Sequence, residues 1–137
     1  TSKAIAELLK GKNYKESGCK EGMAGNSPAV RGVGVGLTLG ALKRKTQLFE
    51  VAVEQCIVTH TDPLCKAGSV AMAAAIDYLL ANRHAFNPSH FIDEVVKEAE
   101  RVSDVMASSL RKVPIFLQKR QKIQTTAKQI MDLIPNC

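Results

Sequence analysis

Residues 61–81 read TDPLCKAGSVAMAAAIDYLLA, and they hold the strongest structural signal in the chain. Asp62 can cap a helix with its side chain, and Pro63 is well tolerated at a first helical position. From Leu64 to Ala81 the residues are rich in alanine and almost all apolar, which is typical of a helix that is buried on most of its surface. The sequence therefore predicts a long, mostly buried helix over residues 64–81.

Upstream of this stretch, hydrophobic periodicity predicts helices over about residues 2–10, 29–42 and 47–60. The second of these is ambiguous because its glycines alternate with apolar residues, which would also suit a strand. Ser27-Pro28 is a good helix start, and closely spaced glycines let two helices approach each other. We therefore interpret residues 29–42 as a tightly packed helix carrying Gly32, Gly34, Gly36 and Gly40.

Downstream, Ser89 is the predicted cap of a helix that runs to about Leu110. After a boundary at Val113-Pro114, an amphipathic helix is expected over residues 115–133. Six helices without a convincing strand predict an all-α fold, a multi-helix orthogonal bundle. We expect residues 1–137 to form a single all-α domain or a fragment of a larger one.

Composition narrows the classes of partner. The chain has a net charge of +6, but only 4% of its residues are aromatic and it has no Trp, so base stacking and nucleic-acid binding are not expected. No apolar run reaches the roughly 18 residues that span a bilayer, so no membrane is expected. The four cysteines form no CxxC pair, which favours a reduced, cytoplasmic location. Cys56, His60 and Cys65 match no common zinc spacing.

Two short motifs stand at helix boundaries, Gly25-Asn26-Ser27-Pro28-Ala29-Val30-Arg31 and Thr59-His60-Thr61-Asp62-Pro63. The first ends a loop of roughly 16 residues, a length typical of functional loops. Glycine-rich loops before a helix offer amides to anions such as diphosphate, although turns use the same residues. Asn26 could hydrogen-bond a ligand or adopt the left-handed conformation of a turn. Arg31 is expected to form a structural salt bridge. His60 could contact a ligand or cap the last carbonyls of its helix.

Together these motifs resemble the ADP-ribosylglycohydrolase family. The first is similar to the family's Gly-Asn-Gly-x-x-Met-Arg motif and the second to its Thr-His-x-x-Pro motif, in the same order. The resemblance implies an all-α enzyme that removes ADP-ribose from proteins or small molecules with a pair of divalent ions, commonly Mg²⁺. It also implies ADP-ribose or an ADP-ribosylated protein as partner, together with the remaining segments of a parent domain.

Carried over position by position, the resemblance implies that Gly22, Met23, Ala24 and Gly25 contact the diphosphate region and that His60 contacts the ligand. Asn26 and Arg31 would fix the loop, with Asn26 counted among the ligand-binding residues. The family's acidic metal-binding clusters are not found in this sequence, so no catalytic or metal-ligating residue is predicted and the chain alone is not expected to cleave ADP-ribose. Two alternatives remain open: a non-catalytic relative, as in crystallins, and a helical interaction domain with a basic last helix.

Overall fold

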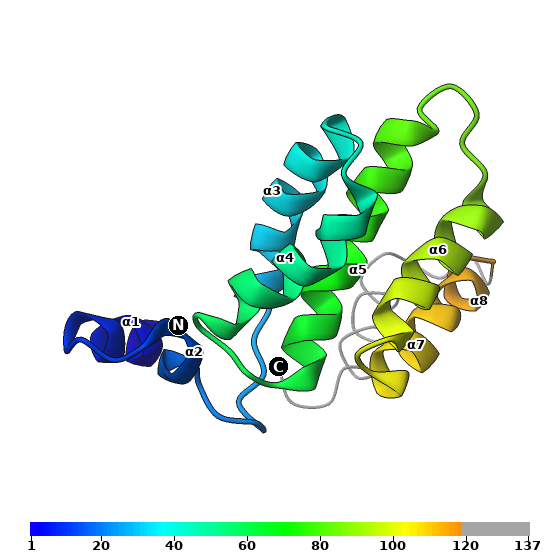
Figure 1. The fold of residues 1–137 in the computed structure, drawn as a ribbon. Helices are drawn as coiled ribbons and strands as arrows, with labels where there is room; N and C mark the ends of the chain where they lie inside the picture. Colours follow the sequence, from blue (N-terminus) through cyan, green and yellow to red (C-terminus); the bar gives the residue numbers. More distant parts are fainter. Residues whose placement is uncertain (119–137) are drawn as a thin grey trace.

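The computed structural model describes residues 1–118, and this part of the chain is helical almost throughout (Figure 1). Within this part no strand forms, and the backbones of Cys19 and His60 make an isolated parallel bridge. The predicted all-α class is confirmed. The eight helices of the described part are α1 (Ser2–Leu9), α2 (Tyr14–Ser17), α3 (Ser27–Ala41), α4 (Lys45–Ile57), α5 (Pro63–Ala81), α6 (Pro88–Glu100), α7 (Asp104–Arg111) and α8 (Val113–Gln118).

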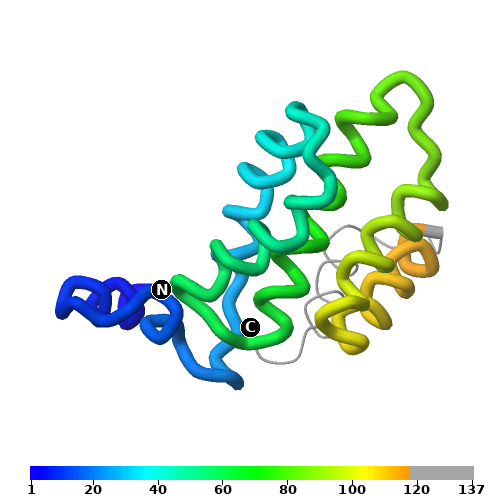
Figure 2. The backbone as a smooth tube through the Cα atoms, in the orientation of Figure 1, coloured from blue at the N-terminus to red at the C-terminus, as the bar shows by residue number. Residues whose placement is uncertain are grey.

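Helix α5 is the centre of the bundle, in contact with α3, α4, α6 and α7. Figure 2 shows α3 on one side of α5 and α6 with α7 on the other, while α1 and α2 lie at one end of the bundle. By length and composition alone, α5 could also cross a membrane, so the expectation that no apolar run is long enough was wrong. Its place between the other helices accounts for that apolar composition.

Helix α5 contributes to two apolar clusters, which explains why its alanines occupy more than one face. One cluster joins α5 to α4, and the other joins α5 to α6. Small side chains let the neighbouring helices pack closely on both sides, so burial is spread along α5. The buried members are Leu48, Ala52, Val70 and Ala73 in the first cluster and Ala71, Val95 and Ala99 in the second.

The glycine-rich segment is helix α3, as predicted, and three of its four glycines, Gly32, Gly36 and Gly40, are points where α3 meets α5. A methyl group on Gly32 would lie 2.5 Å from the Ser69 carbonyl oxygen, and one on Gly36 would lie 2.6 Å from that of Ala73. Gly34 faces open space, with nothing within 4 Å of the same position. Glycines four residues apart therefore form the contact stripe, and Gly34 lies outside it.

Several helix boundaries differ from those predicted. Helix α4 runs from Lys45 to Ile57 rather than over 47–60, because the chain leaves the helix to pair with Cys19. At α3 the cap position is Asn26, so Ser27 is already helical and is not the cap. Asn26 has φ −86° and ψ −10°, which rules out the left-handed turn considered for it.

The predicted helix from Ser89 to Leu110 is two helices. Asn87, rather than Ser89, caps α6 by accepting a hydrogen bond from the His90 amide at 3.1 Å. Ser103 then caps α7 through the Met106 amide, so the chain turns sharply after α6. Helix α8 begins at Val113, earlier than expected, and most of the helix predicted over 115–133 lies outside the described residues.

Candidate functional site

The loop before α3 lies against the turn between α4 and α5, which brings the two sequence motifs together. The Cys19 amide donates to the Thr59 carbonyl at 2.9 Å, and the Thr61 amide donates to the Cys19 carbonyl at 3.0 Å. The Thr61 hydroxyl also donates to the Cys19 carbonyl at 2.8 Å. These contacts join residues about forty positions apart in the chain and fix the base of the loop.

Asp62 holds the same loop at a second point, Gly22. Its Oδ1 accepts from the Leu64 amide at 2.8 Å, which is the predicted helix cap, and its Oδ2 accepts from the Gly22 amide at 2.8 Å. Gly22 has φ +84°, a left-handed conformation that glycine adopts without strain. A carboxylate that is 5% exposed thus ties the loop to the first turn of α5.

Gly25 lies between Cys65 of α5 and the ring of His60. Its amide donates to Cys65 Sγ at 3.1 Å, and the Cys65 thiol donates back to the Gly25 carbonyl at 3.2 Å. A methyl group on Gly25 would lie 2.9 Å from Nε2 of His60. The residue at position 25 must therefore be glycine for the imidazole to keep its place.

His60 is buried, with 6% of its surface exposed, and its ring contacts the loop rather than the end of α4. Nδ1 lies 2.9 Å from the hydroxyl of Thr59. Burial lowers the pKa of His60 below its usual value, and the positive charges of the N-terminal amine and Arg31 act in the same direction against the opposing charge of Asp62. The imidazole is consequently neutral near pH 7.

Arg31 makes no ion pair with any residue in 1–118, so the expected salt bridge was wrong for that part of the chain. Its Nε donates to Oε1 of Gln55 at 2.8 Å, and Nη2 donates to the Thr59 hydroxyl at 2.6 Å and to the Gln55 carbonyl at 3.1 Å. The Gln55 amide nitrogen donates in turn to the Pro28 carbonyl at 3.0 Å and to the Ser69 hydroxyl. Arg31 therefore links the start of α3 to the end of α4 through neutral groups.

The outer part of the loop faces a shallow hollow of about 110 Å³. Met23 is 46% exposed, and Asn26 is exposed as well. Pockets for drug-sized ligands measure roughly 300–1,000 Å³, so this hollow can hold only part of a nucleotide-sized molecule. Its lining residues are Ala24, Gly25, Asn26 and Ala29 from the loop and α3, Leu64, Cys65 and Gly68 from α5, and Met106 from α7.

Of the backbone amides from Ala24 to Ser27, at the end of the loop and the start of α3, those of Ala24, Asn26 and Ser27 have no partner among the described residues. The amides of Gly22 and Gly25 are already bonded to Asp62 and Cys65. Because the free amides stand where α3 begins, the positive end of the helix dipole lies beside them. The arrangement can bind an anion through Ala24, Asn26 and Ser27.

Mg²⁺ does not fit the groups that the structure describes. Residues 1–118 contain no group of three or more His, Cys, Asp or Glu side chains placed to hold a metal ion. Both oxygens of Asp62 are engaged by backbone amides. Burial raises the pKa of Cys56 to about 12, and its thiol donates to the His60 carbonyl, so it offers no thiolate.

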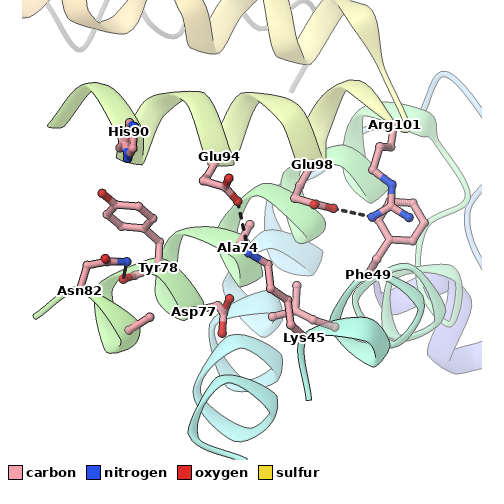
Figure 3. Close-up of a pocket in the computed structure, with 12 residues that line it drawn as sticks. Lys45, Phe49, Ala74, Asp77, Tyr78, Asn82, His90, Glu94, Glu98 and Arg101 are labelled. Atoms are coloured by element: carbon pink, nitrogen blue, oxygen red, sulfur yellow. Dashed lines mark hydrogen bonds and ion pairs between the residues drawn. The ribbon is translucent and has the colours of Figure 1, made fainter. Parts of the chain in front are cut away.

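A second cavity, of about 260 Å³, lies between α4, α5 and α6 (Figure 3). Charged side chains line it, but two ion pairs already join them: Lys45 with Glu94 at 3.3 Å and Arg101 with Glu98 at 2.5 Å. The Arg101 guanidinium also stacks 3.6 Å from the centre of the Phe49 ring. None of the predicted site residues lines this cavity, and sequence reasoning did not find it.

Sequence reasoning also missed the side chains that hold the two motifs together. Nothing local in the sequence distinguishes Gln55 from the other polar residues of its helix, and Cys65 belongs to no recognised metal or redox spacing. Asp62 both caps α5 and bonds the Gly22 amide. Only the cap could be inferred from the sequence, since an Asp before Pro is typical of a helix start. The role of Thr59 depends on Arg31 lying beside it, which no local pattern shows.

Comparison with known proteins supports the family resemblance of the two motifs. The family model described as ADP-ribosylglycohydrolase matches residues 1–134. No curated protein and no solved structure matches the chain. Because the family match covers nearly all 137 residues and includes both docked motifs, the chain belongs to the ADP-ribosylglycohydrolase family.

Proposed function

We propose that this chain supplies the ADP-ribose-binding wall of an ADP-ribosylglycohydrolase that acts on ADP-ribosylated proteins or small molecules. The observation that carries the proposal is the contact between Gly25 and His60, which brings both motifs of the family resemblance together. Family membership supports a hydrolase acting on ADP-ribosylated substrates in general.

In this proposal the diphosphate of ADP-ribose lies at the start of α3. The amides of Ala24, Asn26 and Ser27 are available to its oxygens, and the helix dipole favours the negative charge. Gly22 and Gly25 shape the loop, because their own amides serve Asp62 and Cys65. His60 contacts the ligand beside Gly25, and Met23 lies at the exposed edge of the loop.

Cleavage is proposed to need carboxylates from elsewhere in the protein. The family is generally metal-dependent, and Mg²⁺ is the ion that the resemblance implies. Hard cations of this kind take oxygen ligands such as carboxylates, and residues 1–118 place no such cluster at the loop. The described residues therefore have the role of binding and orienting the ligand.

Titration with ADP-ribose tests the proposal through thermal stability of the full chain. A ligand that binds only the folded state stabilises it by about 2.7 kcal/mol at a hundredfold excess over its dissociation constant. We expect the melting temperature to rise with ADP-ribose and the rise to shrink in His60→Ala. His84→Ala is the matched control, because His84 is exposed and remote from the loop. No rise at millimolar ADP-ribose would contradict the proposal.

A non-catalytic relative is the remaining alternative within the family, and a full-length protein that binds ADP-ribose without cleaving it would identify one. The interpretation as an unrelated interaction domain required the motifs to be coincidental, which family membership opposes. The cytoplasm is the proposed location, supported by the reduced thiols of Cys19 and Cys56.

A further inference from the structure

The Nε2 atom of His60 has no hydrogen-bond partner among residues 1–118. The ring is more than nine-tenths buried, its Nδ1 is bonded to Thr59, and its Nε2 faces Gly25, which has no side chain. A buried polar atom left without a partner loses its hydrogen bonds to water and gains none in return, which is unfavourable. Such an atom beside the proposed ligand loop indicates that a ligand group completes its hydrogen bonding.

The hydroxyl of Thr59 decides whether Nε2 is a donor or an acceptor. This oxygen accepts a hydrogen bond from Nη2 of Arg31 at 2.6 Å, and a guanidinium can only donate. The single Thr59 proton can then go to Nδ1 of His60 at 2.9 Å or to the Cys56 carbonyl at 3.4 Å. The shorter contact favours donation to His60, since a hydrogen bond at 3.4 Å is weak.

Arg31 strengthens this choice in two ways. A hydroxyl that accepts from a cation becomes a better donor and a poorer acceptor, because hydrogen bonds in a chain polarise one another, so it disfavours a proton on Nδ1 that would have to be donated to Thr59. The guanidinium is also fixed in place, since both the side-chain oxygen and the carbonyl of Gln55 accept from it. Arg31 therefore donates to Thr59 in one geometry, and Thr59 donates to Nδ1 of His60.

We propose that Arg31, acting through Thr59, is a positioning residue that holds His60 as the neutral Nε2–H tautomer. His60 then presents a hydrogen-bond donor to the ligand and does not act as a base. The ligand group that meets it must be an acceptor oxygen, such as a phosphate oxygen or the lone pair of a ribose hydroxyl. The assignment of the acceptor to a ligand oxygen rests on the proposed function. The tautomer of His60 does not depend on it.

Long-range ¹H–¹⁵N NMR spectra of the ¹⁵N-labelled full chain, without ligand, test the tautomer directly. We expect Nε2 of His60 to resonate as a protonated nitrogen and Nδ1 as an unprotonated one. His84 and His90 are internal references, because both are exposed and neither ring has a fixed partner in the described part of the chain. A protonated Nδ1 on His60 at neutral pH would overturn the proposal.

Variants separate the positioning role from a merely structural one. Thr59→Ser keeps the hydroxyl and should keep the Nε2–H signature, whereas Thr59→Val removes the donor and should lose it. Arg31→Gln should shift the ring towards a mixture of tautomers. An unchanged His60 signature in a folded Thr59→Val or Arg31→Gln variant would overturn the proposal. If neither variant folds, the spectra of the wild type and of Thr59→Ser still decide which ring nitrogen of His60 carries the proton.

Addition of ADP-ribose to the same labelled sample tests the ligand contact. We expect the Nε2 resonance to move while Nε2 stays protonated, with the references unchanged. If ADP-ribose does not bind at all, the proposed function fails and the tautomer assignment stands on the ligand-free spectra. If ADP-ribose binds and Nε2 loses its proton, the donor role assigned to His60 is wrong.

Discussion

The imidazole of His60 lies so close to the backbone of Gly25 that a single methyl group there would come within 2.9 Å of Nε2. Gly25 belongs to the loop before α3, and His60 to the turn between α4 and α5. The contact requires both a residue without a side chain and a ring held from behind by Thr59. The proposed binding of ADP-ribose is therefore expected to be sensitive to very small changes at position 25.

We expect Gly25→Ala to weaken ADP-ribose binding at least tenfold, because the methyl group must displace the imidazole or the loop. The binding constant measured by calorimetry checks this. Gly34→Ala is the control, since its methyl group would meet nothing within 4 Å and Gly34 does not line the hollow. Equal binding by the Gly25→Ala variant and the wild type would refute the importance of this contact.

Two glycines of α3 should respond to alanine in opposite directions. Gly36→Ala would place a methyl group 2.6 Å from the Ala73 carbonyl oxygen and should destabilise the fold by about 1–3 kcal/mol, as overpacking does. Gly34→Ala meets nothing within 4 Å and should stabilise the fold by about 0.4–1 kcal/mol, because alanine favours a helix. Chemical denaturation measures both values, and a stabilised Gly36→Ala variant would contradict the close approach of α3 to α5.

Gln55→Leu should destabilise the fold by about 2–3 kcal/mol, because it removes the half-buried side-chain amide that bonds both Arg31 and Ser69. Gln47→Leu is the matched control in the same helix, since Gln47 is exposed and its replacement should change stability by less than about 0.5 kcal/mol. Unfolding midpoints in urea provide the comparison. Equal losses in the two variants would show that the network adds nothing to stability.

Stability should fall as the pH drops below about 6.5, the usual pKa of imidazole. Burial lowers the pKa of His60 in the folded protein, so the unfolded chain binds a proton there first as the solution is acidified. The contribution of His60 to the free energy of unfolding is complete above the pKa that it has in the unfolded chain. It is lost progressively as the pH falls from that pKa to the lower pKa of the folded protein. The free energy of unfolding of wild type minus that of His60→Gln, measured from pH 8 to pH 5, should show this fall, and a flat difference would exclude it.

The fold class could be predicted from the sequence because its strongest signals are local. The alanine-rich residues of α5 and the glycines of α3 reveal their packing through composition and spacing alone. The break between α6 and α7 was missed because residues 101–103 contain neither Pro nor Gly, and Ser103 reads as an ordinary helical residue. Short elements such as α2 carry too little periodicity to be seen.

The candidate site was accessible from the sequence only through the family motifs. Those motifs named Gly25 and His60, but not which atoms would meet. The partners of Arg31 are Gln55 and Thr59, more than twenty residues away, and nothing near Arg31 in the sequence indicates them. Salt bridges are the default expectation for arginine, and a neutral amide and hydroxyl replace the carboxylate here.

The two hydrogen bonds that the Asp62 carboxylate accepts, from the Gly22 amide and from the Leu64 amide at the start of α5, have an energetic consequence for ligand binding. A free loop of this length would lose conformational entropy on closing around a ligand, and affinity would fall accordingly. Here the ordering has already taken place during folding, since Asp62, Cys19 and Cys65 hold the loop at three separate points. Pre-organisation of this kind leaves most of the interaction energy with the ligand available as affinity.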